Sequence, residues 1–170
     1  MSRIRTLKSP VVLALAVVVC TVGIVWAVNP HFIFVRASIQ QDGDLNVSFK
    51  EAGLGTNLLI NYLAEADATV TCTCVSHSGK CPNAANKVTS TEAVDQPATF
   101  NSGKNGQVNQ TITLTAPACP SSAPPTCGNG QELRLSAITW DNIELTDQST
   151  PVGPEPAVPS SVSATFFTCP

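Results

Sequence analysis

Charged and aromatic side chains are scarce in this 170-residue sequence. Only 12% of the residues are charged and 5% are aromatic, and there are two histidines and one tyrosine. Three of the nine Lys and Arg residues lie before residue 11, whereas all twelve Asp and Glu residues lie beyond residue 41. The chain after the N-terminal segment therefore carries six positive and twelve negative charges. An acidic surface repels phosphate groups, so nucleic acid is not an expected partner.

Sequence motifs of the common enzyme classes are also missing. There is no G-x-S-x-G sequence, which forms the tight turn that presents the nucleophilic serine in many hydrolases. A serine nucleophile would have to use His77, from a loop, as its general base. Asp141, Glu144 and Asp147 form the best carboxylate cluster, but their three-residue spacing on a strand places them on alternate faces. We therefore expect a protein that is not an enzyme, with no catalytic residues and no cofactor.

The N-terminal segment has the pattern of an export signal. Arg3, Arg5 and Lys8 precede an uncharged apolar run from Val11 to Val28, and Val25-Trp26-Ala27 offers a cleavage site. We expect residues 1–27 to be a signal peptide. An uncleaved membrane-anchor helix is the alternative, because crossing a bilayer takes about 17–25 residues. Both interpretations predict a body outside the cytoplasm, either secreted or anchored and facing outside.

Beyond this segment, apolar and polar residues alternate with a period of two, and helical periodicity is absent. For example, Leu45, Val47 and Phe49 point to one side of an expected strand. The pattern predicts an all-β, Ig-like antiparallel β-sandwich of about 7–9 strands, stapled by disulfides. We expect one domain over residues 28–170, with Pro-rich surface loops at 117–130 and 149–161. The expected strands cover residues 32–37, 45–50, 58–64, 69–75, 88–94 (a weaker, edge candidate), 107–115, 133–139, 143–146 and 164–167.

Three connections between these strands are predicted from turn residues. The segment from Ser102 to Gly106 ends in Asn-Gly, which predicts a β-hairpin between residues 98–101 and 107–115. Glu65 and Asp67 are expected at a bend between two strands, and Asp141-Asn142 at a turn.

Six cysteines follow the N-terminal segment, which in an exported chain predicts three disulfides. Cys72 and Cys74 share one face of a strand and diverge, so each needs a partner elsewhere. Fifteen pairings are open in principle. A zinc site at Cys72-x-Cys74-x-x-His77-x-x-x-Cys81 is the alternative, but thiolates survive poorly in an oxidising compartment, and we expect no metal. The pairs we predict are Cys74 with Cys127, Cys81 with Cys119, and Cys72 with Cys169.

Trp140, Asp141 and Asn142 are the candidate ligand contacts. An indole beside amide and carboxylate groups could stack on a sugar ring. The competing interpretation, which we favour, is that Trp140 is buried at the end of the core and that its indole N–H donates a hydrogen bond to a backbone group. The Pro-rich loop between Cys119 and Cys127 is a further candidate for recognition.

The runs from Val47 to Gly55, from Ala84 to Lys87 and from Ser102 to Gly106 resemble exported bacterial β-sandwich proteins of no assigned activity. The similarity would cover residues 28–147, and it implies an exported sandwich without supplying any site residue. We expect a structural or adhesive protein at or outside the cell surface, with a protein or glycan partner. A carbohydrate- or ligand-binding module is one alternative, and a secreted inhibitor or effector that binds a protein through its Pro-rich loops is another. Contact with a membrane is expected only through an uncleaved N-terminal segment.

Overall fold

Antiparallel strands make up the protein in the part of the chain that the structure describes, which is residues 29–82, 86–120 and 127–169 of a computed structural model. The predicted signal peptide at residues 1–27 lies outside these ranges. No helix long and apolar enough to span a membrane occurs within them. The eight strands are β1 (His31–Ile39), β2 (Leu45–Ala52), β3 (Leu59–Ser76), β4 (Lys87–Asn101), β5 (Gln107–Leu114), β6 (Gln131–Asp147), β7 (Glu155–Pro156) and β8 (Val162–Thr165).

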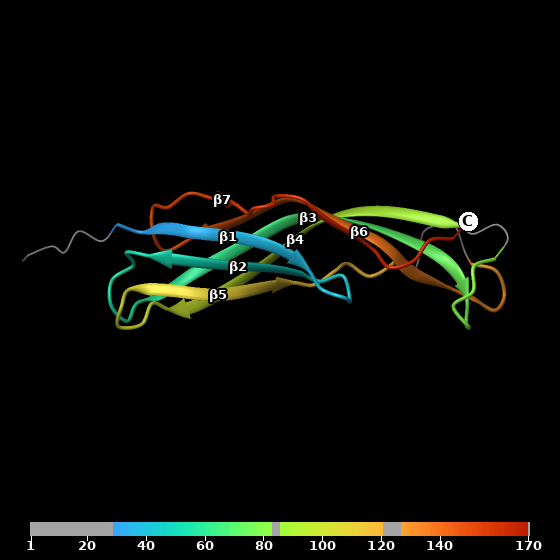
Figure 1. Cartoon of the computed structure of the whole chain (residues 1–170), viewed down its shortest axis with the longest axis horizontal. Helices are drawn as coiled ribbons and strands as arrows, with labels where there is room; N and C mark the ends of the chain where they lie inside the picture. Colours follow the sequence, from blue (N-terminus) through green and yellow to red (C-terminus); the bar gives the residue numbers. More distant parts are fainter. Residues whose placement is uncertain (1–28, 83–85, 121–126, 170) are drawn as a thin grey trace, which may run out of the picture.

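The strands form two sheets, which confirms the predicted all-β class (Figure 1). The smaller sheet has the order β1-β2-β5. The larger sheet has the order β4-β3-β6-β7, and β8 also pairs with β6. All strand pairs are antiparallel.

Three strands of the larger sheet are about twice as long as those of the smaller one. β3 has 18 residues, β4 has 15 and β6 has 17, against 8 or 9 in β1, β2 and β5. The larger sheet therefore continues past the smaller one, and the molecule is an elongated rod (Figure 1). We call the half with both sheets the sandwich half and the remainder the distal half.

The length of β3 and β6 corrects two predictions. The expected bend at Glu65 and Asp67 is a shift of register between β3 and β6 inside a continuous strand. The expected turn at Asp141-Asn142 is also internal to a strand, β6, where Asn142 has a φ of 53°. A β-bulge places an extra residue in one strand, so turn-forming residues can lie within a strand while pairing continues on either side of them.

β4 also joins two segments that were expected to be separate. It runs through Pro97, which has no N–H to give to a neighbour. The position is tolerated because β4 lies at the edge of its sheet and pairs only with β3. The predicted edge position of residues 88–94 is therefore confirmed.

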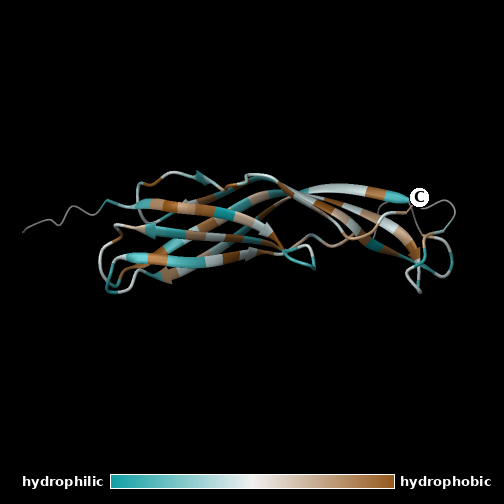
Figure 2. Ribbon diagram, viewed as in Figure 1, coloured by the Kyte–Doolittle hydropathy of each residue, from teal (hydrophilic) through white to brown (hydrophobic). Residues whose placement is uncertain are grey.

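The core lies between the two sheets and follows the predicted alternation, which Figure 2 shows as alternating colours along the strands. Phe49 and Tyr62 pack with their ring centroids 4.7 Å apart, so aromatic rings from β2 and β3 join the sheets. The largest fully buried side chains are those of Trp140, Tyr62, Phe49, Leu45, Leu54, Leu114, Ile138, Ile143, Leu145, Glu51, Val47 and Val70.

The connection from β4 to β5 is not the predicted hairpin, because the two strands belong to different sheets. The turn at Ser102 to Gly106 instead pairs with the preceding connection: Leu54 N–H donates to the Gly106 carbonyl at 3.1 Å, and Ser102 Oγ donates to the Gly55 carbonyl at 2.8 Å. A Cβ atom on Gly106 would lie 2.9 Å from the Gly55 oxygen. Glycine at position 106 therefore allows this turn to approach the backbone at Gly55 closely. The turn leads the chain from the larger sheet to the smaller one.

Candidate functional site

The disulfides lie in the distal half, where no second sheet covers the inner face of β3 and β6. Cys72 and Cys74 are both buried on that face. They bond to Cys119 and Cys127, and this fastens the segment after β5 over the exposed end of the larger sheet. The third disulfide, Cys81–Cys169, ties the end of the chain to the tip of the rod.

The predicted pairing is right for Cys74–Cys127 and wrong for the other two bridges. The structure pairs Cys72 with Cys119 and Cys81 with Cys169. β5 is an edge strand of the smaller sheet and ends at Leu114, so the chain that leaves it first passes the inner face of β3. Cys81 lies beyond the end of β3 and bonds to Cys169. All three thiols of the alternative zinc motif are consumed by these bonds.

Trp140 is fully buried, which confirms the favoured prediction of a core position and leaves its indole unexposed. Its indole N–H donates to the carbonyl of Gly43 at 3.0 Å, so the turn between β1 and β2 is held against β6. Asp141 and Asn142, in contrast, lie on the outer face of the larger sheet. Asn142 Nδ2 donates to Asp67 Oδ2 at 2.7 Å, and Asp141 accepts a hydrogen bond from Ser161 Oγ.

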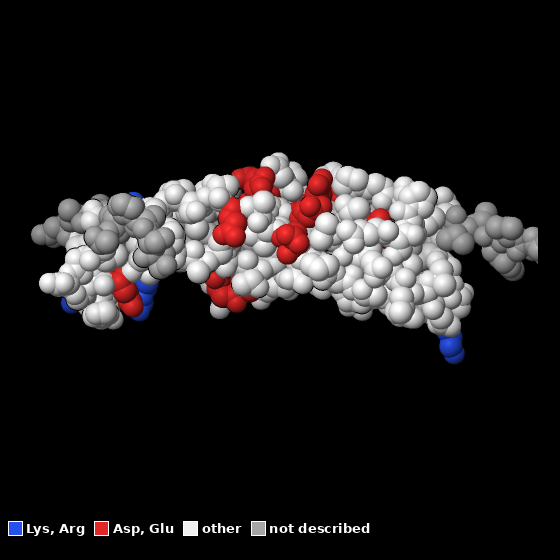
Figure 3. Space-filling model, turned by 180° about the vertical axis from the view of Figure 1, so that it is seen from behind, with Lys and Arg blue, Asp and Glu red and all other residues white. Residues whose placement is uncertain are grey.

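Three carboxylates lie side by side across the outer face of the larger sheet. Glu65 on β3 is directly opposite Asp95 on β4 and directly opposite Glu144 on β6. Asp67 and Asp141 form a second pair immediately beside this row. The expected placement of Asp141 and Glu144 on alternate faces is wrong, because the irregularity at Asn142 puts both on the outer face. Figure 3 shows these acidic side chains gathered over the middle of the rod, with no Lys or Arg among them. We call the five residues the acidic face.

This arrangement is electrostatically unfavourable. The Cβ atoms of residues directly opposite in a sheet lie about 5 Å apart. Two negative charges at about that separation repel each other by about 0.8 kcal/mol even in water. None of Glu65, Asp95 or Glu144 has a salt bridge among the residues described.

A shallow hollow of about 230 Å³ lies at the centre of the acidic face. It is lined by Glu65, Asp67, Asp95 and Glu144, together with Asn142 and small side chains of β3 and β4. The register shift between Glu65 and Asp67 opens it, because a bulge turns neighbouring side chains away from regular alternation. No group of three or more His, Cys, Asp or Glu side chains among the described residues is arranged so that it could hold a metal ion.

A second hollow, of about 310 Å³, lies where the two halves of the rod meet. It combines the aromatic rings of Phe166 and Phe167 with the polar groups of Gln41, Asp42 and Arg134. Aromatic rings beside amide, carboxylate and guanidinium groups are suited to polar ligands with one apolar side.

A buried acid lies between the sheets, away from both hollows. Glu51 on β2 is fully buried, Tyr62 Oη donates to its Oε2 at 2.7 Å, and its Oε1 has no hydrogen-bond partner. Burial, reinforced by the negative charge of the nearby Asp147 and opposed by the hydrogen bond from Tyr62, raises the pKa of Glu51 to about 7. Burial and the neighbouring Glu51 also raise the pKa of Tyr62. Asp147 is held by the Ser149 N–H and the Thr150 hydroxyl.

No protein-family model and no curated protein matches this chain.

Sequence reasoning missed both the acidic row and the buried acid. The members of the row are 30 or more positions apart, so only the pairing of β4, β3 and β6 brings them together. Glu51 carried a usable signal, because it continues the inward alternation of Leu45, Val47 and Phe49.

Proposed function

We propose that this protein is exported and serves as a non-enzymatic structural or adhesive rod at or beyond the cell surface. The observation that carries the proposal is the bonding of all six cysteines after residue 28 in three disulfides. Such bonds persist in oxidising compartments and are rare in the cytosol. The N-terminal pattern of Arg3, Arg5 and Lys8 before an apolar run supports export by a signal peptide or an anchor.

The strand order supports an Ig-like fold for the sandwich half. β1, β2 and β5 face β3 and β6, with β4 added beside β3, and the chain crosses between the sheets after β2, after β4 and after β5. Immunoglobulin-like domains share this arrangement of two antiparallel sheets and Greek-key connections. Many domains with this architecture act at cell surfaces through their loops and sheet faces.

The export proposal is tested by the location and thiol state of the full-length chain. Intact cells are treated with protease, and the protein is then denatured and labelled with a maleimide before and after reduction. We expect digestion from outside, no labelling at the six positions before reduction and labelling of all six afterwards. Recovery from the cytosol with reduced thiols would refute the proposal.

We propose carbohydrate binding as a second candidate function, because the hollow at Phe166 and Phe167 brings aromatic and polar groups together. Phe166 is 36% exposed, so its ring is accessible for stacking on a sugar, unlike that of Trp140. A glycan array probed with the exported protein and with its Phe166→Ala variant tests this candidate. Signals that the variant retains would refute a site at this hollow.

A further inference from the structure

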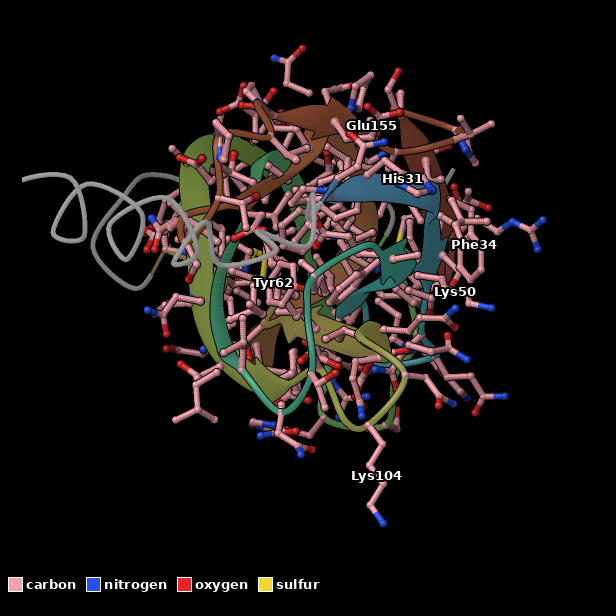
Figure 4. The ribbon with its side chains drawn as sticks, turned by 90° about the vertical axis from the view of Figure 1, so that its left-hand side faces the viewer. His31, Phe34, Lys50, Tyr62, Lys104 and Glu155 are labelled. Carbon is pink, nitrogen blue, oxygen red and sulfur yellow. A yellow bond between two sulfur atoms is a disulfide. The ribbon has the colours of Figure 1, made fainter. Side chains whose placement is uncertain are left out.

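The outer faces of the two sheets carry opposite charge. The acidic face lies on the larger sheet. On the smaller sheet the outward positions include Phe34, Arg36 and Lys50, with Ser, Thr and Asn side chains around them and no Asp or Glu. Figure 4 shows Phe34 and Lys50 projecting from the same side of the molecule. We call these three residues the basic face.

Neither face is neutralised by a salt bridge among the described residues. Arg36 lies over the ring of Phe34, with its guanidinium carbon 5.0 Å from the ring centroid, and no described carboxylate pairs with it. Lys50 likewise has no salt bridge, and its cross-strand neighbours are Phe34 and Asn109. The salt bridges that the described residues make all involve Glu132, at the other end of the rod.

We propose that the acidic face of one copy docks on the basic face of a second copy. This inference deepens the proposed structural role and rests on it. The two faces lie on opposite sides of one sandwich, so each copy keeps one face free after a single contact. A head-to-tail contact of this kind adds further copies and gives an open series or a ring.

The spacing of the charges fits such a contact. Arg36 and Lys50 occupy diagonal positions on neighbouring strands, which places them about 7–8 Å apart. Asp95 and Glu144 flank Glu65 on neighbouring strands, so their strands are separated by two intervals of about 4.8 Å. The long side chains of the basic face can therefore reach across one row of carboxylates.

The contact is expected to be weak and sensitive to salt, because both faces are exposed and polar. Exposed ion pairs are screened once the Debye length falls below their separation. Copies held at high local density on a surface would still associate, since proximity replaces part of the affinity. Charge complementarity also specifies the direction of stacking, because two acidic or two basic faces repel.

Sedimentation velocity of the exported, disulfide-bonded protein from the full-length chain tests the proposal. We expect the weight-average mass at about 0.01 M ionic strength to rise with concentration to at least twice that of the monomer. At about 1 M ionic strength, where the Debye length is about 3 Å, we expect the monomer mass. A monomer at both ionic strengths would overturn the proposal.

Two charge-reversal variants make the test specific. Glu65→Lys/Asp95→Lys/Glu144→Lys reverses the row on the acidic face, and Arg36→Glu/Lys50→Glu reverses the basic face. We expect each variant alone to remain monomeric at low ionic strength. An equimolar mixture should recover at least half of the wild-type increase in mass, because each reversed face then meets its complement. A mixture that stays monomeric would overturn the proposed contact.

Control variants carry charge reversals away from both faces. Asp42→Lys/Glu132→Lys is the control for the first variant and reverses two charges against its three, and Lys80→Glu/Lys104→Glu matches the second. Lys104 projects into solvent from a turn (Figure 4). We expect the controls to associate like wild type. Thermal unfolding of every variant checks the fold, and loss of association in the controls would refute a specific face.

Other occupants of the basic face appear as separate outcomes. A protein that stays monomeric at low salt, yet binds heparin through Arg36 and Lys50, would overturn self-association in favour of an anionic glycan. An exported, fully bonded monomer rejects the stacking alone and leaves the structural role standing. Recovery of reduced protein from the cytosol rejects the proposed function itself, whatever its mass.

Discussion

Replacement of Glu51 by glutamine should remove most of the pH dependence that this buried acid gives to stability. The side chain lies between the sheets and accepts one hydrogen bond, from Tyr62, while its second oxygen has no donor. Its pKa is raised from 4.5 to about 7. The neutral acid is thus favoured in the folded protein, and the neutral amide of glutamine preserves its shape and supplies a donor.

The sign and size of the change in stability with pH follow from the difference in the pKa of Glu51 between the folded and unfolded chains. Below pH 4.5 the acid is protonated in both states, and its contribution to stability is fully present. As the pH rises from 4.5 to about 7, the unfolded chain releases the proton first and stability falls. At about 1.4 kcal/mol per pKa unit, the total loss above pH 7 is about 3 kcal/mol.

Guanidinium unfolding with the disulfides intact measures the effect. Curves for wild type and Glu51→Gln are compared between about pH 4 and pH 8.5, where groups shared by both proteins cancel in the difference. We expect nearly equal stability at the acid end and a variant more stable by up to about 3 kcal/mol at the alkaline end. At roughly 2–4 °C per kcal/mol, the variant should melt about 6–12 °C higher there.

Tyr62→Phe provides the companion variant. The hydrogen bond from Tyr62 lowers the pKa of Glu51, so its removal should move the fall in stability to a higher pH. Curves for wild type and Glu51→Gln that stay parallel across the whole range would refute the assignment, because an acid with an ordinary pKa would produce that result.

Three further changes test other features of the structure. Glu65→Gln removes the middle charge of the acidic row and should stabilise the protein by about 0.5–1 kcal/mol at low salt, an effect that about 1 M salt should abolish in the unfolding curve. Joint replacement of Cys72 and Cys119 by serine should lower the free energy of unfolding by about 2–5 kcal/mol. A double variant that is as stable as wild type would contradict the stabilising role of this bridge. Trp140→Phe removes the hydrogen bond to Gly43 and leaves unfilled volume, so chemical unfolding should show a loss of about 1–3 kcal/mol.

Local alternation predicted the elements of this fold well. The inward positions Leu45, Val47 and Phe49 and the shared face of Cys72 and Cys74 follow from the period of two alone. Side chains on one strand obey this rule whatever the strand pairs with, so the sequence is sufficient to predict them.

Pairing and continuity could not be predicted in the same way. Asp67 and Asn142 are turn-forming residues in isolation, yet in the structure they hydrogen-bond to each other across a bulge. Ser102 to Gly106 makes the predicted turn but joins two sheets, because contacts with the segment around Gly55 decide where the next strand goes. Long-range contacts of this kind also create the acidic row, so that surface has no local sequence signature.

The length of β3 sets how far the molecule reaches. Eighteen residues at about 3.3 Å each span about 60 Å. His31 lies near one end of the rod, and the Cys81–Cys169 bridge lies at the other (Figure 1). A protein held at a surface by the segment before His31, as proposed above, would therefore display its cross-linked tip about 60 Å from the point of attachment.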